Sequence, residues 1–280
     1  MGKTFICSPN KLLCVYQGLE SHLRDLKEVV LEAIEKKKLP RFLYKYRPLN
    51  EFTDSIIINS SFWFARTDSF NDPFDCNLTE EINIKLSDFK RYISKLGIPK
   101  TAIDTNLELA KRSPSIIREQ AIKSRAKTIN SSGLLALSQI YDSILMWSHY
   151  AENHTGIVLC LDLLEDPEFF ITPLKVNYQK TYNPVNFFGR ATDMDYVKKI
   201  IATKSKDWEY EQELRVMKDS VGEHSFNKSL ITKVYFGCKC ENSEKIRIKN
   251  MFKSNNYNGI KFFESNVAYG KFKLNFSKYT

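Results

Sequence analysis

The sequence predicts an α+β fold, in which a single mixed or antiparallel sheet is flanked by helices and carries a helical insertion. Three observations predict it. Short runs rich in Phe, Tyr, Ile and Val recur along the chain and alternate with segments whose apolar residues follow helical spacing. The composition is 42% hydrophobic and 27% charged, which is typical of a folded globular protein. With 280 residues the chain can bury a large core.

Residues 1–40 predict an N-terminal helical segment, and residues 41–280 a single α+β domain. Apolar residues recur at helical spacing in 18–38, and a proline ends this helix. The run RFLYKYR is typical of a strand. A short helix follows in NEFTDSIIIN, with Thr53 or Asp54 as its cap, and SSFWFAR predicts a second, aromatic strand.

The helical insertion is expected at about 83–130, where the chain is polar and charged, with breaks at Pro99 and Pro114. After it, strand-like runs return. We expect a compact helical turn in SILMWSHYA and a fully buried strand in IVLCLDL. The remaining expected elements are strands at 173–179, EYEQELRVM, LITKVYFGC and IKFFESN, and helices at 191–206 and 242–253.

No apolar run approaches the roughly 20 residues that a membrane span needs, and the N-terminus is not typical of a signal peptide. We therefore expect a cytoplasmic protein with no membrane partner. Cys238 and Cys240 form a close pair, but no second pair or nearby His completes a zinc set, so no metal site is predicted. Reduced core thiols are the expected state of the six cysteines, which are Cys7, Cys14, Cys76, Cys160, Cys238 and Cys240.

The net charge of +9 suits an anionic partner such as nucleic acid or a phosphorylated cofactor. The basic residues are scattered along the chain. The segment 111–127 is the best candidate for a basic helix that meets phosphates, because its six cations are accompanied only by Glu119. The alternative is a solvated helix face.

The run LYKYR places two cations on one face of a predicted strand. Lys45 and Arg47 share that face, and Tyr44 and Tyr46 share the other. Two adjacent cations at the end of a strand are suited to a phosphate or pyrophosphate. The alternative is an edge strand that charges protect from further pairing.

The segment FWFARTDSFNDPFD predicts an aromatic strand followed by a stiff turn. Trp63 alternates with two phenylalanines, so one aromatic face is expected in the core. Asn71 and Asp72 begin the turn, with Asp75 close by. Turn hydrogen bonds are the favoured role for these residues, and the alternatives are orienting a basic residue or holding a metal ion.

In MWSHYAENHTG, four residues with chemical potential are consecutive. Trp147, Ser148, His149 and Tyr150 predict a binding or catalytic segment, and a core or surface role for the histidine is the alternative. His154 lies five positions after His149, which is not the i, i+4 spacing that places two zinc ligands on one helical face.

The stretch KDWEYEQELRVM has glutamates at alternate positions. As a strand it would place Glu211, Glu213 and Arg215 on one face, with Glu209 at the strand's frayed start. Adjacent carboxylates repel, so they need a cation, a metal or a substrate hydroxyl. The alternative is a charge ladder with Arg215 and a neighbouring lysine.

Taken together, LYKYR, FWFARTDSFNDPFD, LMWSHYAENHTGIVLCLD and WEYEQELRV resemble the widespread bacterial family called domain of unknown function 2971. The matching segments occur in the family's order and span roughly residues 42–217. The resemblance implies a fold unit with one sheet, and the family's name leaves its activity open.

A more distant resemblance is to NAD-dependent ADP-ribosyltransferases, in the order of a basic first strand, an aromatic strand and a late strand with Glu-x-Glu. It implies that NAD is a substrate, that Glu213 stabilises positive charge on the ribose and that Glu211 orients or deprotonates the acceptor. His149 is the third catalytic candidate. The implied NAD-binding residues are Lys45 and Arg47 for the pyrophosphate, Trp63, Tyr46 and Trp147 for nicotinamide stacking, and Asn71, Asp72, Tyr150 and Arg215. The first strand has no His, and the Ser-Thr-Ser element is missing.

These observations predict an ADP-ribosyltransferase-like enzyme that modifies a nucleic acid or a protein, as a toxin or phage-defence effector. The first alternative is a metal-dependent nuclease, with magnesium held by Asp72, Asp75, Glu211 and Glu213. Its Asp…Glu-x-Lys core is not recognisable, because an Arg stands in the lysine's place. The second alternative is a non-enzymatic module that senses a ligand within a defence system.

Overall fold

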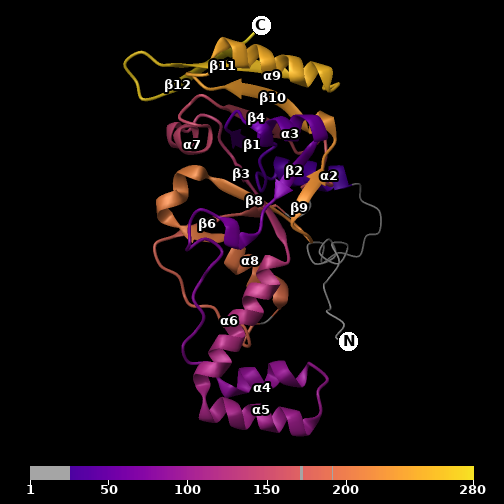
Figure 1. Cartoon of the computed structure of the whole chain (residues 1–280), viewed down its shortest axis with the longest axis vertical. Helices are drawn as coiled ribbons and strands as arrows, with labels where there is room; N and C mark the ends of the chain where they lie inside the picture. The colour runs from indigo at the N-terminus through magenta and orange to yellow at the C-terminus, as the bar shows by residue number, and fades with distance from the viewer. Residues whose placement is uncertain (1–25, 171–172, 191) are drawn as a thin grey trace. The chain divides into compact units, whose positions relative to one another are not determined.

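The structure is a computed structural model that describes residues 26–170, 173–190 and 192–280 (Figure 1). The chain divides into two compact units. The first comprises the described residues up to Phe64 together with Leu134–Lys175 and Glu209–Thr280, and the second comprises Ala65–Gly133 and Val176–Trp208. None of the helices in these described ranges is long and apolar enough to cross a bilayer.

The first unit is built on an eight-stranded sheet in the order β12-β11-β10-β4-β1-β3-β8-β5. Strand β1 pairs antiparallel with β3 and β4, β10 with β4, β11 with β12, and β5 with β8, whereas β10 and β11 are parallel. Helix α9 connects those two parallel strands, as parallel pairing requires. The expected mixed sheet with flanking helices is therefore confirmed. The strands are β1 (Phe42–Arg47), β3 (Gly133–Ser138), β4 (Ile157–Asp162), β5 (Leu174–Lys175), β8 (Glu213–Lys218), β10 (Ile231–Phe236), β11 (Lys261–Val267) and β12 (Leu274–Lys278).

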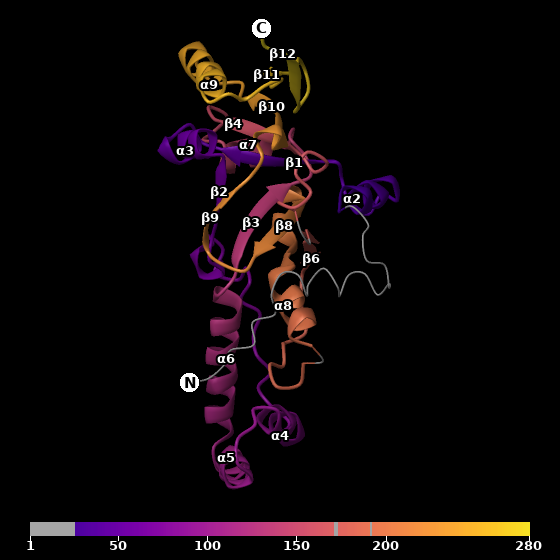
Figure 2. The same cartoon turned by 90° about the vertical axis from the view of Figure 1, so that its right-hand side faces the viewer.

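Apolar side chains cover both faces of this sheet. On one face, Leu159 of β4 packs with Ile57 and Ile248, which come from helices α3 (Glu51–Asn59) and α9 (Asn242–Ser254) (Figure 2). On the other face, Val158 packs with Trp147 of helix α7 (Ile144–Tyr150). All six residues of β4 are buried, which confirms the buried strand that its continuous apolar run predicted.

Smaller elements complete the first unit. Strands β2 (Ser61–Phe64) and β9 (Gly222–Ser225) form a separate antiparallel pair, and helix α2 (Leu26–Glu35) contributes Val30 to the core. The helix expected at 18–38 is confirmed over α2, and its first residues lie outside the described ranges. The 3-10 turn η3 (Lys228–Leu230) leads into β10.

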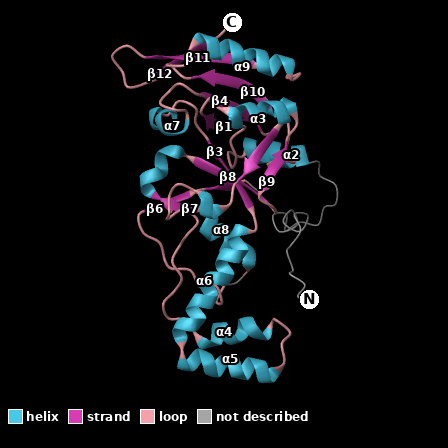
Figure 3. Ribbon diagram, in the orientation of Figure 1, coloured by secondary structure: helices cyan, strands magenta, loops and turns pink. Residues whose placement is uncertain are grey.

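The second unit is mainly helical and contains α4 (Leu86–Ser94), α5 (Lys100–Arg112), α6 (Pro114–Asn130) and α8 (Asp193–Ile201) (Figure 3). The helices expected in 83–130 are confirmed, with Pro99 as the N-cap of α5 and Pro114 at the first turn of α6. Strands β6 (Asn177–Gln179) and β7 (Thr203–Ser205) pair in parallel, and η1 (Thr67–Ser69) is a short 3-10 turn.

Three expected elements have different bounds. The helix expected at 191–206 is shorter, because β7 at its end pairs with β6 instead of extending α8. The strand expected at 173–179 is two strands, β5 and β6, in different sheets. The strand expected from EYEQELRVM begins only at β8, because its first half forms the 3-10 helix η2 (Lys206–Glu211).

The basic helix expected at 111–127 is not one helix, because α5 ends at Arg112 and α6 begins at Pro114. One of its cations is also structural. Arg125 is buried and donates a hydrogen bond to the Leu78 carbonyl, with its guanidinium 4.0 Å from the Glu80 carboxylate. The expected basic segment is therefore interrupted at Ser113, and one of its six cations is buried.

The cysteines in the described ranges are free thiols. Cys76, Cys160 and Cys240 are buried and Cys238 is half-buried, which confirms the expectation of reduced core thiols for these four. Burial raises the pKa of both Cys160 and Cys240 to about 11, so neither is a reactive thiolate. Cys7 and Cys14 lie outside the described residues.

Helix α3 is capped by a residue that the sequence reasoning did not select. The cap is Asn50, whose side-chain oxygen accepts a hydrogen bond from the Thr53 N–H at 3.2 Å, so the prediction of Thr53 or Asp54 is wrong. Both of those residues lie inside the helix, where Thr53 donates its hydroxyl to the Pro48 carbonyl at 2.7 Å.

This cap gives a direct test of the local fold. Asn50→Ala should lower the free energy of unfolding by about 1 kcal/mol, because the cap hydrogen bond is lost, whereas Asn50→Asp should retain it. Urea denaturation of the three proteins measures the difference. Equal stabilities of the Ala and Asp variants would contradict this assignment of the cap.

Candidate functional site

Strand β1 carries a lysine into the middle of the large sheet. Because β1 lies between β4 and β3, the edge-strand interpretation of LYKYR is wrong. Lys45 is half-buried, and its ammonium donates a hydrogen bond to the Ala136 carbonyl of β3 at 2.9 Å. Burial and the neighbouring Arg47 lower the pKa of Lys45 to about 8, against the opposing pull of the Glu213 and Glu211 carboxylates.

Arg47 is held at the end of the same strand. Its Nε donates to the hydroxyl of Thr53 at 3.1 Å, at the first turn of α3, and burial lowers the pKa of the guanidinium. Tyr44 and Tyr46 lie in the aromatic core on the opposite face. The expected division of β1 into a cationic face and a tyrosine face is therefore present.

Strand β8 contributes a buried ion pair. The Nε of Arg215 donates to Oε1 of Glu213 at 2.7 Å, and the second guanidinium nitrogen donates to Oε2 at 3.0 Å. The two side chains are 0% and 5% exposed. They lie two positions apart on one strand, so the expected shared face is confirmed for this pair, and the two-point geometry neutralises the carboxylate.

Glu211 lies on a different element from the expected strand. It lies in η2, and Gln212 has a φ of 44°, which breaks the strand alternation, so the prediction that Glu211 shares a strand face with Glu213 is wrong. The buried carboxylate accepts a hydrogen bond from the Tyr150 hydroxyl at 2.5 Å, and the Glu211 carbonyl accepts one from the Ser138 hydroxyl at 2.7 Å.

Two adjacent residues of helix α7, His149 and Tyr150, contact different partners. Tyr150 contacts Glu211, whereas His149 is exposed and its Nδ1 lies 2.9 Å from the Tyr210 hydroxyl. His149 is therefore at the surface beside Tyr210. Tyr210 directly precedes Glu211 in the sequence. The consecutive polar and aromatic residues of MWSHYA signalled this helix, but nothing in them specified which one would contact a carboxylate.

Two of the proposed stacking residues are core residues. Trp147 is 0% exposed and donates its indole N–H to the Tyr141 carbonyl at 2.8 Å. Tyr46 is buried against it, with ring centroids 5.5 Å apart. Neither ring has a face open to a ligand, which removes both as nicotinamide-stacking residues. Trp63 of β2 is 62% exposed, with its neighbours Phe62 and Phe64 buried.

Asn71 and Asp72 belong to the second unit. Asp72 is buried, and its Oδ1 accepts a hydrogen bond from the Phe74 N–H at 2.9 Å, which is the turn role that the sequence favoured. Nearby, Asp75 forms a buried ion pair with Lys204 at 3.4 Å. Sequence reasoning missed Lys204, because a lysine between a threonine and a serine gives no sign of burial.

The acids proposed as magnesium ligands are divided between the units, with Asp72 and Asp75 in one and Glu211 and Glu213 in the other. Within the described ranges, no group of three or more His, Cys, Asp or Glu side chains could hold a metal ion. The ligand set that the nuclease hypothesis required is therefore not assembled among the residues that the structure describes.

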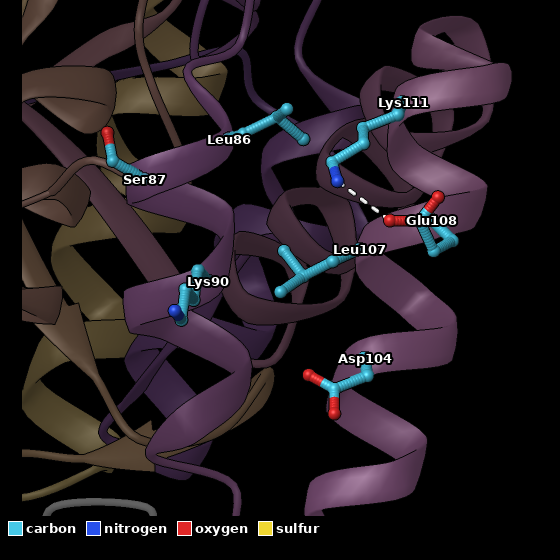
Figure 4. A pocket seen from close by; sticks show the side chains of 7 residues that line it. All are labelled: Leu86, Ser87, Lys90, Asp104, Leu107, Glu108 and Lys111. Carbon is cyan, nitrogen blue, oxygen red and sulfur yellow. Dashed lines mark hydrogen bonds and ion pairs between the residues drawn. The ribbon is translucent and has the colours of Figure 1, made fainter.

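A separate hollow lies between α4 and α5 in the second unit (Figure 4). An ion pair between Lys111 and Glu108 at 2.7 Å lies at its rim, and both side chains are more than half exposed. Such a surface pair contributes little, and the hollow contains none of the predicted catalytic or NAD-binding residues. Its lining residues are Leu86, Ser87, Lys90, Asp104, Leu107, Glu108 and Lys111.

The first unit thus brings together two cations of β1, Glu211 at the end of η2, Glu213 at the start of β8, and the hydroxyls of Tyr150 and Ser138. Residues 146–216 match the model of the family described as a protein of unknown function, DUF2971. The match supports the DUF2971 resemblance over this part of the chain, which includes Tyr150, Glu211, Glu213 and Arg215. Comparison with curated proteins and with solved structures gives no match, so the ADP-ribosyltransferase resemblance rests on the residues alone.

The buried ion pair predicts a large and asymmetric response to mutation. Arg215→Met should lower the free energy of unfolding by about 3–5 kcal/mol, because the buried Glu213 carboxylate loses the charge and the two hydrogen bonds of Arg215. The double variant Glu213→Leu with Arg215→Met should recover much of this loss. Denaturation of the single and double variants measures the coupling, and additive losses would contradict a paired role.

The lowered pKa of Lys45 predicts a pH dependence with a defined sign. Between pH 8 and 10.5 the folded protein has released the Lys45 proton and the unfolded chain still binds it, so the free energy of unfolding rises across this window, by up to about 1.4 kcal/mol per pH unit. Lys45→Met should remove that rise, and Lys38→Met, at an exposed position, should not. If the free energy of unfolding of Lys45→Met rose with pH in parallel with that of the wild type, the lowered pKa of Lys45 would be contradicted.

Proposed function

We propose that this protein is an enzyme that transfers the ADP-ribosyl group of NAD to a macromolecular acceptor. The observation that carries the proposal is the pair of buried glutamates on either side of Gln212, beside a lysine whose pKa is lowered. Buried carboxylates placed beside cations and hydroxyls are the arrangement that supports charge stabilisation in a reaction. No part of the proposed chemistry requires a metal ion.

The buried carboxylates are suited to stabilise the positive charge that develops when NAD loses nicotinamide. When the glycosidic bond between nicotinamide and ribose breaks, its electron pair leaves with nicotinamide and positive charge develops on the ribose, as in glycoside hydrolysis. We assign the stabilisation of this charge to Glu211, the carboxylate that accepts the hydrogen bond of the Tyr150 hydroxyl. Glu211 thereby takes the charge-stabilising role that the resemblance implied for Glu213, in addition to its implied role toward the acceptor. Tyr150 orients the Glu211 carboxylate through its 2.5 Å hydrogen bond.

The two cations of β1 are suited to the negatively charged part of NAD. Lys45 is protonated at neutral pH, because its pKa is about 8, and Arg47 lies two positions further along the strand. Together they provide charge for the pyrophosphate of NAD. The acceptor's hydroxyl or amine adds to the ribose carbon, and its proton passes to Glu211 or to water. The net charge of +9 favours an anionic acceptor such as nucleic acid.

Release of nicotinamide from labelled NAD tests the proposal. In the presence of nucleic acid and protein acceptors, Glu211→Gln should slow release by roughly a hundredfold or more, because the charge stabilisation is lost. Glu209→Gln is the matched control, since Glu209 is an exposed glutamate of the same 3-10 helix. An absence of release by the folded wild-type protein, or a full rate in Glu211→Gln, would refute it.

A module that binds a nucleotide without turnover is the second candidate. It is favoured by the fact that Lys45 and Glu213 are already held by protein partners, Ala136 and Arg215. In that case calorimetry would detect NAD or ADP-ribose binding that Lys45→Met weakens, while no nicotinamide is released. We extend the proposal to a toxin or defence role, and growth arrest on induced expression of wild type but not of Glu211→Gln would separate the enzyme from the sensor.

A further inference from the structure

The turn that joins β11 to β12 exposes aromatic side chains to an unusual degree. Tyr269 and Phe272 are 103% and 101% exposed, and Val267 beside them is 72% exposed. Neither ring makes a ring contact or a hydrogen bond through its side chain among the described residues. Single exposed apolar residues are common, but three within six positions form a patch. Figure 1 shows the turn as the loop at the upper left, beyond the ends of the two strands.

The turn is built to hold this conformation. The Ala268 N–H donates to the Lys273 carbonyl at 2.9 Å, which closes the loop, and Gly270 provides the positive φ of 66° that the turn needs. Below the turn, Leu274 is buried in the aromatic cluster that also contains Trp147. The exposed aromatic residues therefore lie on a turn that backbone hydrogen bonds hold in shape.

The charge around the turn has one sign. Lys271 and Lys273 alternate with Phe272, and Lys278 follows on β12. Residues 265–280 contain no Asp or Glu. All three lysines are exposed, so their ammonium groups are available to an anionic partner, and their alkyl stems can lie along an apolar phase while the charges stay in the polar layer.

We propose that the tip, Val267–Lys273, docks on an anionic lipid surface. Such a surface provides negative headgroups for the lysines and an acyl layer for Phe272 and Val267, with Tyr269 at the boundary between them. Single-stranded nucleic acid is less well matched, because its stacking sites are usually combined with a basic groove, whereas these rings stand fully exposed on a turn between two strands. The sequence expectation of no membrane partner considered only continuous apolar runs, which a turn of this kind lacks.

Co-sedimentation with vesicles tests the proposal. The full chain should bind vesicles of equal parts phosphatidylcholine and phosphatidylglycerol more tightly than vesicles of phosphatidylcholine alone. Tyr269→Ala with Phe272→Ala should weaken binding by about tenfold or more, because two aromatic side chains no longer leave water. Phe52→Ala is the matched control, since Phe52 is 64% exposed on α3 and should bind as the wild type does.

The lysines are tested in the same assay. Lys271→Gln with Lys273→Gln should weaken binding to the anionic vesicles and reduce its sensitivity to salt, whereas Lys38→Gln with Lys95→Gln, at exposed positions elsewhere, should not. Phe272→Trp should add fluorescence that acyl-brominated lipids quench. Salt-insensitive binding, no quenching, or equal binding by the aromatic variant and the wild type would overturn the proposal.

Nucleic acid is the competing outcome. If single-stranded RNA or DNA binds the protein, anionic vesicles do not, and the aromatic double variant loses that binding, then the tip is a nucleic-acid contact and the lipid assignment is overturned. If the wild type binds neither partner while circular dichroism shows that it is folded, the proposal of an anionic docking surface is likewise overturned.

Discussion

The first unit depends on the balance of charge buried in its sheet. Lys45 stands on a central strand, where burial lowers its pKa to about 8, and the carboxylates of Glu211 and Glu213 oppose that shift. Arg215, itself 0% exposed, neutralises Glu213. A buried charge that loses its partner is costly, so these groups are interdependent. The strand order β1-β3-β8 places these charged groups together. The residues that must balance one another's charge in the folded sheet are therefore also the residues of the candidate site.

Stability alone does not explain why such groups are inside. Replacing a buried ion pair by apolar residues of similar volume is often neutral or stabilising, and the surrounding core of Leu43, Leu137 and Leu214 is apolar. A lysine with a lowered pKa beside two buried glutamates is instead typical of sites where protonation or charge takes part in function. The two hydroxyls that contact Glu211 fix its position, which a catalytic or binding carboxylate requires.

Local patterns in the sequence predicted much of this arrangement. The alternation in LYKYR predicted both faces of β1, and Pro99 and Pro114 predicted the breaks between helices. The order of the strands had no local signal, since it depends on pairing between distant segments. The start of β8 was missed because Gln212 adopts a left-handed backbone conformation. A glycine at this position would have indicated such a conformation, but a glutamine does not. The burial of Trp147 was equally hidden, because an aromatic residue suits both a core and a ligand site.

The account is tested most directly by the titration of Lys45, followed by NMR of lysine labelled at the ε-carbon, with and without ADP-ribose. It predicts a midpoint of about 8 in the free protein, a lower midpoint in Glu211→Gln because an opposing carboxylate charge is gone, and a higher one when ADP-ribose brings its pyrophosphate to the ammonium. A midpoint near the ordinary value of 10.5 that neither Glu211→Gln nor ADP-ribose moves would contradict the site.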